Sequence, residues 1–114
     1  MKCETLDVWK RACRLSTEIY QAMRGCKDFG FKDQITRSGL SVASNIAEGV
    51  ERKSSKEKRR FLDIALGSAA ELKTQTYIGM KIDYIKREDG MKWTKELEEL
   101  QRMINALSEG MHDS

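Results

Sequence analysis

Proline is absent from the 114-residue sequence, and aromatic residues make up only 7 % of it. No stretch approaches 18 consecutive apolar residues, so the sequence predicts no membrane-spanning helix and no membrane partner. Charged residues, by contrast, reach 34 %. This composition is typical of an all-α protein with a well-solvated exterior. At this length we expect one domain, residues 1–114, with a single core.

Histidine and cysteine are too few and too scattered for a metal site. Cys3, Cys13 and Cys26 have no CxxC spacing, and the single histidine is His112. We therefore expect no metal and no cofactor. The odd number of cysteines predicts free thiols in a reducing cytoplasm. Because no serine or cysteine has a partner that would activate it, the sequence also predicts a non-enzymatic protein.

The basic residues are concentrated in the first half of the chain. Residues 1–60 carry 14 Lys/Arg against 8 Asp/Glu, a net charge of +6. Residues 61–114 carry 7 against 10, a net charge of −3. Such asymmetry permits nucleic-acid contact or head-to-tail self-association and does not choose between them.

Helical spacing of apolar residues predicts a first helix over 4–24 and a second over 32–50. The stripe of the first recurs at steps of three and four: Leu6, Trp9, Cys13, Ser16, Tyr20 and Met23. The stripe of the second consists of Ile35, Gly39, Val42, Ile46 and Gly49. Between the two segments, Phe29 and Phe31 are expected to close one end of the structure.

Two longer helices follow. Ser54 and Glu57 form a capping-box pattern, in which each side chain accepts a hydrogen bond from the other residue's amide, so a helix begins there and extends to about Ile82. Its expected core face is Phe61, Ala65, Ser68, Leu72, Gln75 and Gly79. A last helix over 87–109 ends at Gly110. Its apolar stripe is Trp93, Leu97, Leu100, Ile104, Leu107 and then Met111. Four such helices predict an antiparallel up-down-up-down four-helix bundle.

Residues 41–49, SVASNIAEG, place small and polar side chains on one helical face. Small residues allow another helix to approach closely, which would offset the roughly 1 kcal/mol that Gly39 costs relative to alanine. We expect Asn45 and Glu48, with Ser68 and Glu71 of the third helix, to form a structural polar core that fixes the helix register.

Glu48 and Glu71 also raise the possibility of carboxylate chemistry between facing helices. Di-iron bundles need Glu-x-x-His motifs on their helices, however, and none of the four expected helices contains one. We therefore expect the two carboxylates to accept hydrogen bonds or salt bridges from Arg37 or Arg52, within the bundle or between subunits.

A basic run occupies residues 52–60, where six Lys/Arg stand against the single acid Glu57. Runs of charged residues usually do no more than face the solvent, but this run coincides with the expected start of a helix. The candidate nucleic-acid-binding residues are Arg52, Lys53, Lys56, Arg59 and Arg60. Contact through them would be made to phosphates and would be sequence-independent and salt-sensitive. No aromatic residue is interleaved with them, so base stacking is not indicated.

Several motifs together resemble a known family. They are LDVWK at 6–10, FGF at 29–31, QI at 34–35, SVASNIAEG at 41–49, FLDIALGSAAEL at 61–72 and YI at 84–85. In them the sequence resembles the four-helix-bundle proteins first noticed as reading frames within intervening sequences of bacterial 23S ribosomal RNA genes. The family usually has a proline near Cys26 or Lys27 and a glycine at Asp83, so this sequence departs from the family at those two turns and not in the helices.

The resemblance implies a four-helix bundle that assembles into a homopentamer. Relatives include the accessory variability determinant protein of diversity-generating retroelements, a basic pentamer that works with a reverse transcriptase and nucleic acid. We therefore expect a non-enzymatic oligomer that binds RNA or DNA non-specifically through its basic face. The alternative is a protein–protein adaptor, such as an accessory subunit of a reverse transcriptase, with no direct nucleic-acid contact.

Overall fold

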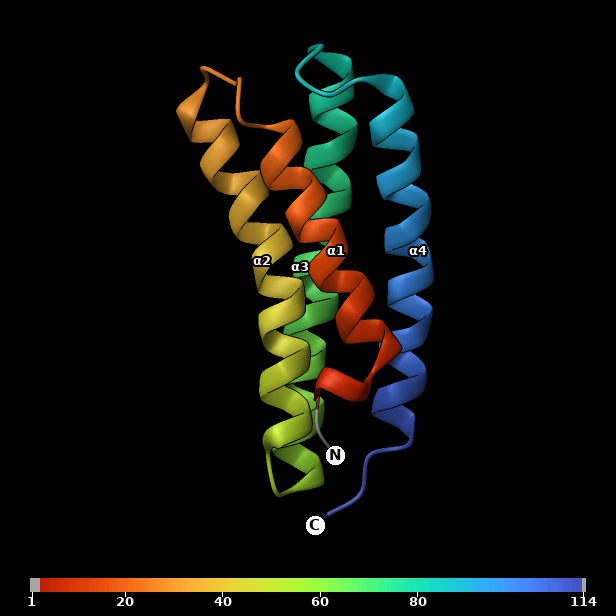
Figure 1. The fold of residues 1–114 in the computed structure, drawn as a ribbon. Coiled ribbons are helices and arrows are strands. Elements are labelled where there is room, and N and C mark those ends of the chain that lie inside the picture. The colour runs from red at the N-terminus through yellow and green to blue at the C-terminus, as the bar shows by residue number, and fades with distance from the viewer. Residues whose placement is uncertain (1–2, 114) are drawn as a thin grey trace.

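Four α-helices run alternately up and down along a rod of 46 × 22 × 21 Å in the computed structural model, which describes residues 3–113 (Figure 1). Residues 1–2 and 114 of the predicted domain lie outside the described residues. The short 3-10 turn Cys3–Thr5 precedes the helices α1 (Asp7–Ala22), α2 (Phe29–Glu51), α3 (Ser55–Lys81) and α4 (Arg87–Glu109). The predicted all-α four-helix bundle is therefore confirmed.

Side-chain caps set where two of the helices begin. The Asp28 carboxylate accepts from the amide of Phe31 at 3.1 Å, so α2 begins at Phe29, three residues before the expected start. Ser54 accepts from the amide of Glu57 at 3.1 Å, which confirms the first bond of the predicted capping box. These bonds satisfy amides that the first turn of a helix leaves without a partner.

The core confirms the predicted faces of α2 and α4. All five members of the α2 stripe are buried. In the α4 stripe, four of the five residues within the helix are buried, and so is Met111, which follows the helix. Leu107 is only half-buried. In α3 the predicted Ala65, Ser68, Leu72 and Gly79 are buried. Leu62, Ala69 and Thr76 are buried as well, while Phe61 and Gln75 are half-buried at the edge.

The predicted face of α1 was only partly correct: Ser16 and Met23 are buried as expected. Tyr20 is 44 % exposed, and Trp9 and Cys13 are half-buried. The helix instead turns a more aliphatic face inward, formed by Val8, Ala12, Leu15, Ser16, Ile19 and Met23. Both stripes have helical spacing, so periodicity could not separate them. The aliphatic face packs against the other helices, and this arrangement leaves the Tyr20 hydroxyl in water.

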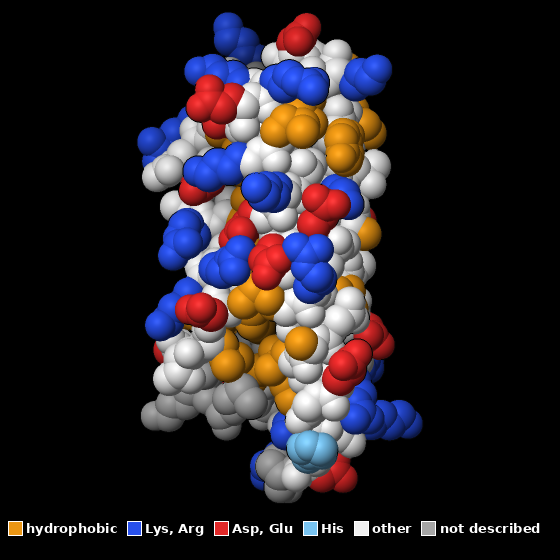
Figure 2. All heavy atoms as spheres, turned by 90° about the vertical axis from the view of Figure 1, so that its right-hand side faces the viewer, with side chains coloured by type: hydrophobic (Ala, Val, Ile, Leu, Met, Phe, Trp, Pro, Cys, Tyr) orange, Lys and Arg blue, Asp and Glu red, His pale blue; other side chains and the backbone are white. Residues whose placement is uncertain are grey.

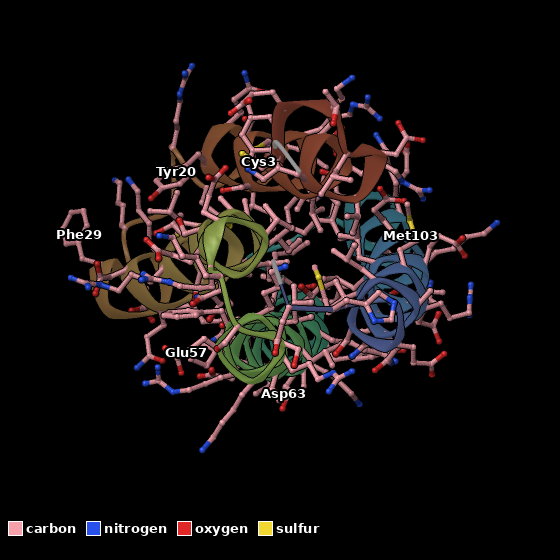
Figure 3. All side chains as sticks on the ribbon, turned by 90° about the horizontal axis from the view of Figure 1, so that it is seen from below. Cys3, Tyr20, Phe29, Glu57, Asp63 and Met103 are labelled. Atoms are coloured by element: carbon pink, nitrogen blue, oxygen red, sulfur yellow. The ribbon has the colours of Figure 1, made fainter. Side chains whose placement is uncertain are left out.

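Phe29 and Phe31 separate at the end of the bundle where α2 begins. Phe29 is 73 % exposed and points away from the helices (Figure 3), so its expected role in closing that end was wrong. As the first residue of α2, it lies beyond the reach of the core. Phe31 is half-buried and meets the ring of Tyr84 edge to face, at 5.3 Å between centroids.

The α3–α4 turn adopts the backbone shape that a glycine would favour. Asp83 has φ of 63°, in the left-handed region. Aspartate tolerates this conformation better than most residues. The family's glycine position is thus filled by Asp83 in a left-handed conformation.

At Gly39, α2 lies against α1, since a Cβ there would be 3.7 Å from the Ser16 Cα; at Gly49 it lies still closer to α3. A Cβ on Gly49 would lie 3.1 Å from the backbone carbonyl oxygen of Lys58, so α2 and α3 touch almost backbone to backbone there. A Cβ on Gly39 would find its nearest atom, in Ile19, at 3.5 Å, an ordinary contact. Gly49 therefore positions the start of α3, where the basic run lies.

None of the helices described could cross a lipid bilayer. Cys3, Cys13 and Cys26 are free thiols, as expected. Desolvation raises the pKa of the Cys13 thiol. A raised pKa disfavours the reactive thiolate.

Candidate nucleic-acid interface

The predicted basic residues gather where α2 passes into α3, at the lower end of the bundle in Figure 1. We call this set the basic face: Arg52, Lys53, Lys56, Arg59 and Arg60. All five residues are exposed. A shallow hollow of about 590 Å³ lies along it, lined by Ser55, Lys56, Arg59, Arg60, Asp63 and Ile64. Figure 3, seen from this end, places Glu57 and Asp63 on the α3 side.

Arg52 and Arg60 are held in place by the ring of Phe61. Their guanidinium carbons lie 4.8 and 5.2 Å from the ring centroid. Arg52 also pairs with Glu48 one turn earlier, and Arg60 lies 3.6 Å from Glu57. Sequence reasoning assigned Phe61 only to the core and missed this role, although its position directly after Arg60 was a usable signal. Because two guanidinium groups lie over the ring, Phe61 holds these cations and is not a free stacking surface.

Arg59 and the neighbouring Lys58 contact the segment that follows α4. Arg59 donates to the carbonyl oxygens of Ser108 at 3.4 Å and Met111 at 3.2 Å. Lys58 Nζ donates to the carbonyl oxygen of His112 at 2.7 Å. These partners lie 49 to 54 positions apart in the sequence, so local patterns carried no signal for them.

Asp113 completes this contact by reaching the first turn of α3. Its carboxylate accepts a hydrogen bond from the backbone amide of Ser55. The backbone and side-chain hydrogen bonds from Ser55, followed by the charges of Lys58 and Arg59, lower the pKa of Asp113. A negative charge is favourable here because the amides at a helix start are partly positive.

Only two of the four residues predicted for the polar core, Ser68 and Asn45, lie at least partly inside the chain. Ser68 is buried and hydrogen-bonds Ser41 at 2.7 Å, while the half-buried Asn45 donates to the Ser41 hydroxyl at 2.9 Å. Glu48 and Glu71 are exposed, so their assignment to the interior of the chain was wrong. Their carboxylates project beyond the small residues that bring α2 and α3 together. The expected partner of Glu48 is correct, since it pairs with Arg52.

A second hollow, of about 630 Å³, lies between α1 and α4. Five cations and three carboxylates line it, and some of them pair: Arg11 lies 2.5 Å from Glu96, and Lys92 lies 3.3 Å from Glu18. Figure 2 shows basic and acidic side chains intermingled over the middle of this side of the molecule. Carboxylates are more numerous among its cations than in the hollow of the basic face, where Asp63 is the one acidic lining residue, so it is a weaker candidate for an anion.

Residues 3–113 contain no group of three or more His, Cys, Asp or Glu side chains that could hold a metal ion. With exposed cations and no assembled nucleophile or acid–base pair described, the geometry at the α2–α3 end suits binding of an anion.

The 23S rRNA-intervening sequence protein family matches residues 4–106. The chain belongs to this family. Its fold is similar to a crystal structure of a protein of unknown function from the S23 ribosomal protein family of Bacteroides thetaiotaomicron. The TM-score is 0.82 at 25 % identity, over 89 % of this chain and 97 % of the other. No curated protein matches the sequence.

Proposed function

We propose that this family member is a non-enzymatic protein that binds RNA or DNA through phosphate contacts at its basic face. The observation that carries the proposal is the set of five exposed cations within nine residues around the start of α3. Phosphates bind well at such a place, because lysine and arginine supply charge and the helix start adds partial positive charge. The contacts would read the backbone and not the base sequence.

The basic face is also ordered enough to bind without a large loss of side-chain freedom. The ring of Phe61 and the carboxylates of Glu48 and Glu57 restrict the guanidinium groups of Arg52 and Arg60. Each guanidinium remains substantially exposed, with side-chain exposures of 44 % and 61 %. An arginine that is restrained but still exposed is suited to phosphate oxygens, because its planar guanidinium carries several donors.

Self-association into a homopentamer is part of the proposal. A ring of bundles would present several copies of the basic face to one nucleic acid and raise its apparent affinity. Glu71, exposed on the single chain, is a candidate for pairing between subunits, whereas Glu48 already pairs with Arg52. Light scattering at several protein concentrations tests this, and a monomer throughout would refute it.

A mobility-shift titration with a structured RNA over a salt series tests the nucleic-acid proposal. The double variant Lys56→Glu/Arg60→Glu should lose most of the affinity at low salt. The matched control is Lys27→Glu/Lys86→Glu, which makes the same charge change at two exposed residues of the opposite end. If the two double variants lose equal amounts of RNA affinity, the effect reflects net charge and not the basic face. If the wild type does not bind RNA at low salt, the proposal is refuted.

A second candidate, a protein–protein adaptor such as an accessory subunit of a reverse transcriptase, draws on the opposite end of the bundle. Tyr77, Ile82, Tyr84 and Met91 are each 41 to 49 % exposed there. Clustered exposed apolar side chains often mark protein contacts. Co-purification from the native host separates the two candidates: a stoichiometric polymerase partner and no nucleic acid would favour the adaptor.

A further inference from the structure

The segment that follows α4 lies over the start of α3 and occupies part of the surface that nucleic acid would use. We call residues 110–113 the strap. Its carbonyl oxygens at Met111 and His112 accept from Arg59 and Lys58, and its Asp113 carboxylate accepts from the amide of Ser55. A phosphate bound at the start of α3 would need these same donors.

A buried side chain fixes the position of the strap. Met111 is 3 % exposed and belongs to the hydrophobic core, directly between the exposed residues Gly110 and His112. Burial of one methionine contributes about 1.5–3 kcal/mol. His112 and Asp113 are therefore held beside α3 by an anchor that does not depend on their own hydrogen bonds.

The chemistry of the Asp113 contact resembles that of a bound phosphate. The carboxylate is an anionic oxygen acceptor at the first amide of a helix, near two cations. Oxygen anions of either kind are favoured at this position by the helix dipole and the free amides.

We propose that the strap is a built-in competitor for the basic face. Without nucleic acid, Asp113 occupies the start of α3 while the strap carbonyls hold Lys58 and Arg59. When nucleic acid binds, a phosphate replaces the carboxylate, and the two cations turn to the phosphate backbone. The inference rests on the proposed function and adds a regulation of the same surface.

The variant Asp113→Ala removes the competing carboxylate, and Glu109→Ala is its matched control. Glu109 is exposed in the last turn of α4, so the control removes one negative charge from the same neighbourhood without touching the Ser55 contact. We expect Asp113→Ala to bind a single-stranded RNA about ten-fold more tightly than Glu109→Ala at low salt. Release of Lys58 and Arg59 to phosphates should also steepen its salt dependence by about 1.4 in log–log slope, at roughly 0.7 per phosphate.

A measurement without nucleic acid tests the contact itself. Hydrogen exchange at the Ser55 amide should become at least about ten-fold faster in Asp113→Ala and stay unchanged in Glu109→Ala, because only the first loses its acceptor. Asp113→Asn, which keeps an oxygen acceptor but no charge, should fall between the wild type and Asp113→Ala in affinity. It also provides a test if Asp113→Ala does not fold.

The outcomes distinguish the strap from the proposed function. If the wild type binds RNA and the two variants Asp113→Ala and Glu109→Ala bind it with equal affinity, the proposal that the strap competes is refuted and the proposed function stands. Unchanged exchange at Ser55 in Asp113→Ala also overturns the strap. Absence of RNA binding by the wild type and by Asp113→Ala alike overturns both.

Discussion

The Tyr84 hydroxyl donates to Asp28 Oδ2 at 2.9 Å, and this bond joins the α1–α2 and α3–α4 connections at one end of the bundle. The other oxygen of Asp28 caps α2 through the amide of Phe31. The bond from Phe31, followed by the bond from Tyr84, lowers the pKa of Asp28. One carboxylate therefore starts a helix and ties together two connections that are far apart in the sequence.

Acid should weaken the fold partly through Asp28. Because its pKa is lower in the folded than in the unfolded chain, its contribution is complete above the unfolded value of about 3.9 and is lost as pH falls through the folded value. Asp28→Asn should therefore show a smaller fall in Tm between pH 5 and pH 2 than the wild type. Circular dichroism melts measure this, and parallel Tm curves for the two proteins would contradict it.

Two glycines of the α2 stripe should respond oppositely to alanine. Gly39→Ala meets only ordinary contacts and should stabilise the protein by about 0.5–1 kcal/mol through the lower backbone entropy of the unfolded state. Gly49→Ala forces a Cβ against the Lys58 carbonyl and should cost about 1–3 kcal/mol. Urea denaturation of both variants measures the difference. A stabilising Gly49→Ala would mean that α2 and α3 are farther apart than described.

The Arg11–Glu96 pair should stabilise the α1–α4 contact more than surface pairs do. Two hydrogen bonds of 2.9 and 2.5 Å join them, and their side chains are only 29 % and 26 % exposed. Glu96→Gln should cost about 1 kcal/mol. The control Glu98→Gln, whose wild-type side chain is 53 % exposed and 3.5 Å from Lys73, should cost less than about 0.5 kcal/mol. Equal losses in urea denaturation would show that burial adds nothing to the first pair.

The orientation of α1 can be tested with two adjacent residues. Ile19 is 1 % exposed and Tyr20 is 44 % exposed. Ile19→Ala should cost about 2–5 kcal/mol, and Tyr20→Ala less than about 1 kcal/mol. Guanidinium denaturation compares them. The reverse order would restore the face expected from the sequence, with Tyr20 directed inward.

Helix boundaries and most of the core could be predicted because they depend on local signals. The cap at Ser54 and the regular apolar spacing of α4 lie within a few residues of the features they determine. The face of α1 could not be chosen in this way, since Ile19 and Tyr20 both continue a helical stripe. Which one is buried depends on what α2 and α4 present to it.

The candidate site was predictable in its location but not in its contacts. A run of cations at a helix start is visible in the sequence, so the basic face was found. The strap was missed because Asp113 and Ser55 are 58 positions apart, and the segment after α4 has no pattern of its own. Glu48 and Glu71 were misplaced since a small-residue motif does not tell which polar neighbours lie just outside the packed face.

The up-down order of the helices also bears on how the chain folds. Consecutive helices run antiparallel beside each other, so much of the packing joins segments that are near in sequence (Figure 1). Such topologies have low contact order and reach the native state within microseconds to milliseconds. The contact between the strap and α3 forms later, because Asp113 can reach Ser55 only after α4 has packed against the other helices. A newly folded bundle would therefore pass through a brief interval in which its basic face is complete and not yet covered.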